Sequence, residues 1–162
     1  MAVHRLLIDD FVTIDYGLIA IHSSLEDYRL AYFMNRELSI LLEKSNHDIG
    51  VTINEGESCF SRFIFENPDD DSMWNLIQNK AKVISMQSNT STSLFEDTDM
   101  SLTTNVFLMP ELKKVDYVLK IENIPAHLEL DDIVEKLLTI KQVATAYTID
   151  HTKLKSKNNL IF

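Results

Sequence analysis

The last third of the chain carries a strand-like, a helix-like and a second strand-like pattern in immediate succession. Over residues 115–122 apolar and polar side chains alternate, with the period of two that a strand with one apolar face shows. Residues 130–140 place apolar side chains at helical spacing behind Asp131 and Asp132, which suit the positive end of a helix dipole. Residues 143–149 alternate again. This order predicts a βαβ unit, which requires a sheet with a helix packed across it.

A strand followed by a helix is also predicted near the start of the chain. Residues 17–22 form an apolar run that is typical of a strand. Ser23 and Ser24 follow, and each has an acidic residue three positions later, which is the capping-box spacing at the start of a helix. Apolar side chains then recur at spacings of three and four. We therefore expect a helix from about 25 to 43 that ends near Lys44, where a cation suits the negative end of the dipole.

The middle of the chain predicts a hairpin. Two strand-like runs, 50–53 and 59–65, flank a turn that contains a glycine. Alternating side chains of the second run point to opposite faces, and we expect the core face to hold Cys59, Ser61, Phe63 and Phe65.

Three further extended segments and one long loop complete the predicted elements. Residues 73–78 and 81–85 have extended character, and 106–109 predicts a strand that ends at Pro110, because proline cannot donate to a sheet ladder. Residues 87–101 are rich in Ser, Thr, Asn and Asp. Loops of this length are usually mobile or functional, and we expect 87–101 to be a mobile loop.

Together these elements predict a single α+β domain over residues 1–162. A chain of 162 residues with 45% hydrophobic residues is long and apolar enough to form its own core. We expect a two-layer sandwich, in which a mostly antiparallel sheet carries the two main helices on one face. By analogy of element order, the arrangement is similar to a ferredoxin-like sandwich with inserted strands.

Charge and cysteine content restrict the partners and the compartment. The formal net charge of −10 disfavours nucleic acid as a partner, because such binding depends on Lys and Arg contacts with phosphates. The apolar stretch 16–21 is far shorter than the roughly 20 residues that cross a bilayer, so no membrane partner is expected. A single cysteine, Cys59, and the absence of a signal-peptide pattern predict a cytoplasmic protein.

No motif predicts catalytic, cofactor-binding or metal-binding residues. The five histidines share no metal-ligand spacing, and the three glycines form no phosphate-binding motif. Cys59 could serve as a nucleophile with His22 or His47 as its base, but a lone cysteine in an apolar strand is more often a small buried hydrophobe. Acidic residues form the other catalytic alternative, and they are Asp9, Asp10 and Asp15.

Residues 109–117, which we call the signature segment, read Met-Pro-Glu-Leu-Lys-Lys-Val-Asp-Tyr. This segment resembles the consensus Ile-Pro-Glu-x-x-x-Val-Asp-Tyr of the bacterial IPExxxVDY family, with Met109 in place of isoleucine, an apolar side chain of similar volume. The resemblance implies no activity, substrate or cofactor. Further stretches that look like this family cover much of the chain, and they are 27–30 with Asn35, 60–63, 146–150 and 154–162.

The signature segment predicts a structural brace, with a shared binding surface as the alternative. Tyr117 belongs to the core face of the strand at 115–122, and Asp116 lies on the opposite face. A covered aspartate would need a cationic partner, for which Arg29 and Arg62 are the candidates. Glu111 belongs to the same predicted brace.

Two other features leave a contact with a partner open. Tyr28 and Tyr32 add more aromatic surface to the first helix than one buried stripe needs. If they are exposed, they form an interface anchor, because aromatic residues dominate interface hot spots, and otherwise they belong to the edge of the core. The C-terminal basic and apolar tail, 151–162, has three lysines and no acidic residue. We expect it to dock its apolar end on the core, and the alternative is an arm that pairs with another protein or a second copy.

The leading hypothesis is a non-enzymatic cytoplasmic domain that acts through protein contacts, either with an unknown protein partner or as a homodimer. The alternative is a small-molecule (metabolite) binding or regulatory domain. An enzyme is the least favoured of the three, since no catalytic set is visible beside a well-patterned core.

Overall fold

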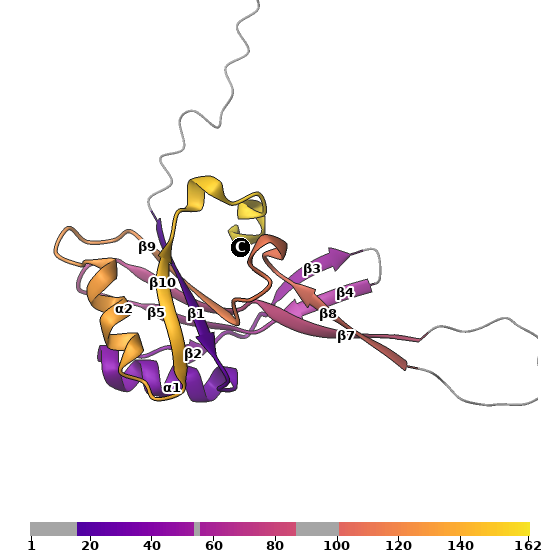
Figure 1. Ribbon diagram of the computed structural model, residues 1–162. Coiled ribbons are helices and arrows are strands. Elements are labelled where there is room, and N and C mark those ends of the chain that lie inside the picture. Colours follow the sequence, from indigo (N-terminus) through magenta and orange to yellow (C-terminus); the bar gives the residue numbers. More distant parts are fainter. Residues whose placement is uncertain (1–15, 54–55, 87–100) are drawn as a thin grey trace, which may run out of the picture.

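The computed structural model describes residues 16–53, 56–86 and 101–162, and its centre is a six-stranded sheet flanked by two helices (Figure 1). The strand order is β10-β1-β9-β6-β5-β2, and every neighbouring pair is antiparallel. The strands are β1 (Tyr16–Ser23), β2 (Glu43–Lys44), β5 (Arg62–Glu66), β6 (Met73–Gln78), β9 (Tyr117–Glu122) and β10 (Val143–Ile149), and the helices are α1 (Asp27–Leu38) and α2 (Leu130–Leu138).

The core topology is that of a ferredoxin-like sandwich. In chain order the elements β1, α1, β6, β9, α2 and β10 form two βαβ units, and their strands lie in the order β10-β1-β9-β6. Each unit is split, because β9 lies between β1 and β6, and β1 lies between β9 and β10. The insertions between these elements include two hairpins, β3 (Ile49–Ile53) with β4 (Gly56–Phe60) and β7 (Lys80–Met86) with β8 (Ser101–Phe107). The α+β sandwich expected from the sequence is confirmed.

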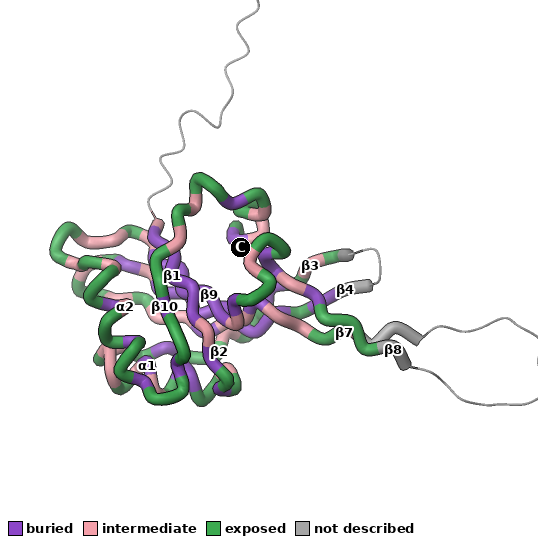
Figure 2. The backbone as a smooth tube through the Cα atoms, viewed as in Figure 1, coloured by how far each residue is buried: buried purple, intermediate pink, exposed green. Residues whose placement is uncertain are grey.

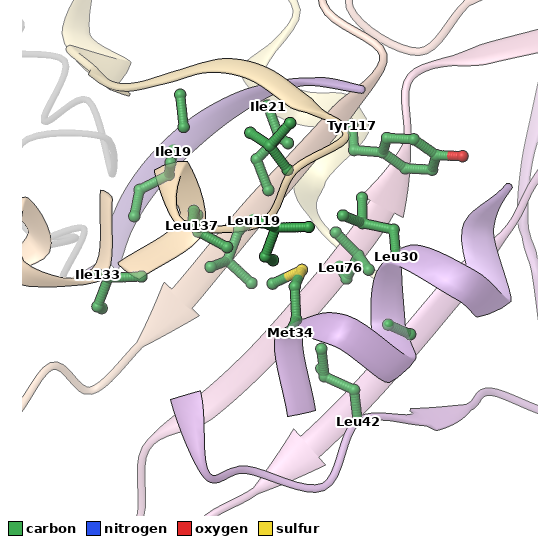
Figure 3. Packing of buried hydrophobic residues seen from close by; sticks show 14 of the residues in the cluster. Ile19, Ile21, Leu30, Met34, Leu42, Leu76, Tyr117, Leu119, Ile133 and Leu137 are labelled. Atoms are coloured by element: carbon green, nitrogen blue, oxygen red, sulfur yellow. The ribbon is translucent and has the colours of Figure 1, made fainter. Parts of the chain in front are cut away.

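Both helices cover the same face of the sheet and form the larger core with it (Figure 3). Leu30 and Met34 of α1 and Ile133 and Leu137 of α2 are buried against Leu119 in the middle of β9. The apolar stripes of the helices, at spacings of three and four, therefore meet the apolar face of the sheet.

The second face of the sheet is covered by irregular structure and by the tail. A separate cluster of buried residues lies there, to which the tail contributes Leu154 and Leu160. Three 3-10 helices form part of this cover, and they are η2 (Pro110–Leu112), η3 (His151–Lys153) and η4 (Lys157–Leu160). The two hairpins extend from the body beside each other, and burial is concentrated in the sheet (Figure 2).

Because both faces are covered, β9 is buried on both sides. The sequence predicts one apolar and one polar face for 115–122, but Val118 is as fully buried as Leu119 and Ile121, and Lys120 is only 5% exposed. The prediction of a polar face is wrong because β9 is a central strand and the tail crosses over it.

Helix α1 is shorter than expected and starts differently. It spans Asp27–Leu38 rather than 25–43, and Ser39 ends it in the left-handed conformation with φ 55°. Its N-cap residue is Glu26, which makes no side-chain capping bond, so the predicted capping box does not form. The Ser23 hydroxyl instead donates to the Gln142 carbonyl and accepts from the Leu25 N–H.

The predicted hairpin is confirmed, but its second run divides at Ser61. Residues before the break form β4 of the hairpin, and residues after it form β5 of the main sheet. The break changes the alternation, so Phe60 is fully buried and Cys59 is exposed, opposite to the expectation. Phe63 is buried as expected.

Other predicted boundaries differ by a few residues. Only Val106 and Phe107 of the strand predicted at 106–109 belong to a strand, which is β8 (Ser101–Phe107), and Leu108 and Met109 follow its end. The rest of the predicted mobile loop, 87–100, lies outside the described residues. In the part of the chain that the structure describes, no helix is long and apolar enough to cross a membrane.

Leu119→Ala tests the central position of β9. The leucine is fully buried between both helices, and a cavity at such a site costs about 2–5 kcal/mol in free energy of unfolding. The control Leu138→Ala removes a leucine that is 47% exposed on α2 and should change stability by less than about 0.5 kcal/mol. Urea unfolding of both variants measures this difference, and equal costs would contradict the packing described above.

Candidate functional site

Helix α1 presents tyrosines to solvent on the side opposite its buried residues. Leu30 and Met34 point into the core, whereas Tyr28 is 59% exposed and Tyr32 is 63% exposed. The two tyrosines are four residues apart and so lie on the same side of the helix. Arg29 is exposed beside them. We call Tyr28, Arg29 and Tyr32 the α1 face.

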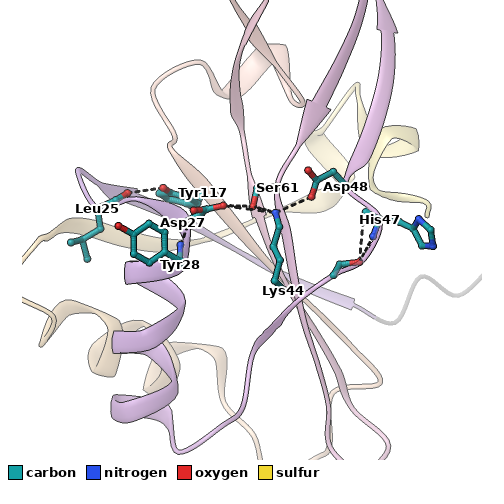
Figure 4. Close-up of polar contacts among 9 residues, drawn as sticks. Leu25, Asp27, Tyr28, Lys44, His47, Asp48, Ser61 and Tyr117 are labelled. Atoms are coloured by element: carbon teal, nitrogen blue, oxygen red, sulfur yellow. Dashed lines mark hydrogen bonds and ion pairs between the residues drawn. The ribbon is translucent and has the colours of Figure 1, made fainter.

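A polar network fixes the start of α1 (Figure 4). The Ser61 hydroxyl donates to the Asp27 carboxylate, and the Lys44 ammonium donates to Ser61 Oγ at 2.6 Å. Lys44 also forms an ion pair with Asp48 at 2.9 Å. Asp27 Oδ1 in turn accepts from the Tyr28 N–H at 2.8 Å. The α1 face is therefore carried on a helix that is tied to β2 and to the β4–β5 junction.

Tyr117 of the signature segment holds the chain just before α1. Its hydroxyl donates to the Leu25 carbonyl at 2.6 Å, and the side chain is buried. Burial, together with the negative charges of Asp27, Asp116 and Glu26, raises the pKa of Tyr117 to about 12. The tyrosine therefore stays protonated, and remains a donor, at all ordinary pH values.

Asp116 is paired, but not with the arginines that the sequence suggests. Its carboxylate accepts from the Ser23 N–H at 3.0 Å and from the Lys80 ammonium at 2.6 Å. Neither Arg29 nor Arg62 is its partner, because Asp116 precedes β9 and lies where β1 ends and β7 begins. Asp116, just before β9, thus binds the end of β1 through Ser23 and the start of β7 through Lys80. Lys80 and Asp116 are 36 positions apart in the sequence.

Glu111 anchors the C-terminal tail. A single carboxylate oxygen accepts from the Lys155 N–H at 2.9 Å, the Ser156 N–H at 2.9 Å and the Ser156 hydroxyl at 2.8 Å. Burial alone would raise the pKa of Glu111, but the hydrogen bonds from Ser156 and Lys155 outweigh it and leave that pKa lowered. The tail docks on the sheet through Leu154 and Leu160, while its last two residues stay exposed.

Asn79 was not predicted from the sequence as a site residue. Both its side-chain nitrogen and its side-chain oxygen form hydrogen bonds. It is fully buried and donates to the carbonyls of Leu112, at 2.8 Å, and Val115, at 3.0 Å. Its own side-chain oxygen accepts from the Met109 N–H at 2.9 Å. The visible signal in the sequence is one polar residue between two strand-like runs, which does not distinguish a buried amide from an exposed one.

Arg62 lies on the second face of the sheet with Asn75 and Lys120. Its guanidinium donates twice to the Asn75 side-chain oxygen, from Nε at 2.9 Å and from Nη2 at 2.7 Å. Lys120 was not predicted from the sequence as a site residue either. It is buried, forms an ion pair with Glu122 and donates to the Leu160 carbonyl at 2.8 Å. Arg62 therefore belongs to a buried polar cluster under the tail rather than to the signature segment.

The residues considered for catalysis do not form a site. Cys59 is exposed, and no hydrogen bond joins it to His22 or His47. Among the described residues, no three His, Cys, Asp or Glu side chains gather closely enough to hold a metal ion. The acidic residues in the alternative set, Asp9, Asp10 and Asp15, lie outside the described residues.

Comparison with known proteins identifies no relative. No family model matches the chain, and no curated protein or solved structure is significantly similar to it.

Tyr117→Phe should destabilise the protein by about 1 kcal/mol, because it leaves the buried Leu25 carbonyl without its donor. Wild type should also lose stability as the pH rises from about 10 to 12, since the pKa of Tyr117 is raised only in the folded state. Below pH 10 its contribution is fully present. The Tyr117→Phe variant should not show the part of this stability loss that deprotonation of the Tyr117 hydroxyl causes. Denaturant unfolding from pH 8 to 12 checks both effects, with Tyr32→Phe as the exposed control.

Protonation of Glu111 should release the tail. Because the pKa of Glu111 is lowered in the folded state, its stabilisation is present above the ordinary value of 4.5 and is lost as the pH falls through the lowered pKa. The amide proton shifts of Lys155 and Ser156 should titrate with a midpoint below 4.5, and Glu111→Gln should abolish this titration. NMR spectra from pH 2.5 to 7 measure it, and a midpoint above 4.5 would argue against the anchor.

Proposed function

We propose that the chain is a protein-interaction domain whose contact surface is the α1 face. The observation that carries this proposal is the exposure of two tyrosines, Tyr28 and Tyr32, one helical turn apart on a helix whose other side is fully packed. A helix needs such residues neither for its own core contacts nor for its solubility.

The composition of the α1 face supports a protein partner. Tyrosine and arginine are among the residues most enriched at interface hot spots, because they combine large apolar area with polar groups. Each buried tyrosine removes about 150–250 Å² from water. The Tyr32 ring already packs edge-on against Phe33 at 5.5 Å, so it is partly ordered before a partner binds. Less side-chain entropy is then lost on association.

The partner is either another protein or a second copy of this chain. In a symmetric dimer the α1 face would contact itself about a two-fold axis, which is the commonest arrangement of homo-oligomers. The exposed unpaired thiol of Cys59 supports action in the reducing cytoplasm. We propose no catalytic role, because the described residues offer no nucleophile with a base.

We also propose that the chain is a member of the IPExxxVDY family. The support is the resemblance of the signature segment, in which Glu111, Asp116 and Tyr117 each bind a distant part of the chain. Residues with such roles are expected to be kept together in relatives.

Small-molecule binding is a second candidate function, favoured by open pockets on the β2 and β3 side of the molecule. One pocket of about 500 Å³ lies at the β2 edge of the sheet, where Leu41, Ile64 and Phe65 give it an apolar wall. Its volume falls in the range of about 300–1,000 Å³ that ligand sites occupy.

The double variant Tyr28→Ala/Tyr32→Ala tests the proposed interface. Loss of two hot-spot side chains should weaken association at least about tenfold, because each typically contributes more than 1 kcal/mol. Sedimentation velocity measures self-association, and quantitative mass spectrometry of a tagged pull-down measures capture of another protein. The thermal unfolding temperature should change little, since both side chains are exposed.

Tyr147→Ala is the matched control, because Tyr147 is an exposed tyrosine on β10 and not on α1. It should retain full association. If the double variant and wild type associate equally, or if Tyr147→Ala is equally impaired, the α1 face is not the contact surface.

A further inference from the structure

A pocket of about 470 Å³ lies between strand β3 and the C-terminal tail. Residues 49–52 of β3 form one wall, and Asn158, Asn159 and Phe162 of the tail form another. Arg62 lines the pocket from the sheet. The main sheet separates this pocket from the helices, because the buried contacts of the tail lie on the second face.

Arg62 supplies a positive charge that no carboxylate neutralises at close range. Within the described residues, its guanidinium makes no ion pair, and both of its hydrogen bonds go to the neutral Asn75 amide. Burial lowers the pKa of Arg62, and the charge of Glu122 opposes that effect. An arginine remains cationic even so. A guanidinium has five N–H donors, and the two bonds to Asn75 leave three of them for another acceptor.

The other charges around the pocket leave this positive charge dominant. Asp48 also lines the pocket, but the Lys44 ammonium neutralises it at 2.9 Å. Lys120 lies nearby, since the Phe162 ring is within 4.9 Å of its ammonium and within 4.1 Å of the Arg62 guanidinium. Glu122 pairs with Lys120, so among the described residues the guanidinium of Arg62 is the positive charge at the pocket that no carboxylate pairs with.

The buried Asn75 amide lies directly behind Arg62 and holds its guanidinium. Asn75 is fully buried, and its side-chain nitrogen has no hydrogen-bond partner. Its oxygen is already shared by two Arg62 donors. Asn75 does not itself line the pocket, so its part is to hold the guanidinium of Arg62 in place from behind through these two bonds.

We propose that this pocket binds a small organic carboxylate, with the carboxylate on Arg62 and the apolar part of the ligand against the Phe162 ring. The planar guanidinium matches a carboxylate in two parallel hydrogen bonds. One arginine beside neutral asparagine amides suits a single negative charge better than a doubly charged phosphate. Phe162 stacks on the guanidinium and is 44% exposed, so it offers a ring face to the ligand. The site is independent of the α1 face and of the function proposed for it.

NMR titration of the full ¹⁵N-labelled chain with sodium benzoate, sodium acetate and sodium phosphate tests this proposal, with sodium chloride holding the ionic strength constant. Benzoate should shift the Arg62 Nε–Hε and Asn75 side-chain amide resonances saturably, with a millimolar Kd, and acetate should bind several-fold more weakly because it lacks a ring. Tighter binding of phosphate than of both carboxylates would overturn the assigned ligand class. Shifts that chloride reproduces in full would overturn the site.

Two pairs of variants complete the test. Arg62→Gln should weaken benzoate binding at least about tenfold through loss of the charge-assisted pair, whereas Arg36→Gln, which removes an exposed arginine of α1, should not change it. Thr52→Asp places a negative charge on the exposed pocket wall without touching the Arg62–Asn75 contact, so it remains informative if Arg62→Gln fails to fold. It should weaken binding several-fold, and Thr148→Asp on β10 is its control. Benzoate affinity unchanged by Thr52→Asp would overturn the proposal.

Discussion

The arrangement of this protein depends on the buried side chain of Asn79. Its amide joins three backbone groups of the signature segment, the N–H of Met109 and the carbonyls of Leu112 and Val115. Its own backbone also binds the same region, through the Asp116 carbonyl and the Leu108 N–H. All these groups are paired in a largely buried site, where an unpaired polar atom would be costly. Asn79 therefore fixes the place where the chain leaves the main sheet for the β7–β8 hairpin and returns to it.

From that fixed turn, the signature segment reaches three distant parts of the chain. Glu111 binds the tail, and Asp116 binds the end of β1 and the start of β7. Tyr117 binds the Leu25 carbonyl, just before α1. Each of these contacts is polar and directional, so together they fix where the distant segments lie. Most of the stability comes from the two apolar clusters. The segment thus positions both the α1 face, through Tyr117, and the tail wall of the Arg62 pocket, through Glu111.

The fold class could be predicted from the sequence because it depends on local periodicity. The helical spacing of α2 and the alternation in β10 are properties of short segments, and the antiparallel sheet with two helices on one face follows from their order. The number of large side chains on the first helix indicates that Tyr28 and Tyr32 lie either at an interface or at the edge of the core, and their exposure in the structure excludes the second. Such local patterns can be interpreted without knowing which distant residues pack against them.

The errors arise where a neighbour distant in sequence decides the outcome. Cys59 is exposed and Phe60 buried because the strand breaks at Ser61 and its two parts join different sheets. Asp116 pairs with Lys80 because two strands meet there, and neither residue carries a local signal of the other. Lys120 is buried because the tail crosses over β9, about 40 residues later in the chain. Period-two alternation correctly placed its side chain on the face opposite Leu119, but it could not show that this face is covered.

The two faces of β9 differ in a way that stability alone does not explain. The helix side is closed by apolar side chains. The tail side buries Lys120 and Asn75 and partly buries Arg62, groups whose transfer from water costs several kcal/mol unless every donor finds an acceptor. Lys120 has its acceptors in Glu122 and the Leu160 carbonyl, whereas Asn75 does not have its full set. Apolar residues of similar volume in place of a buried ion pair are often neutral or stabilising, so stability alone does not require these polar groups. Arg62 is the member of this cluster that lines the pocket, and its remaining donors are the groups that the proposed carboxylate would satisfy.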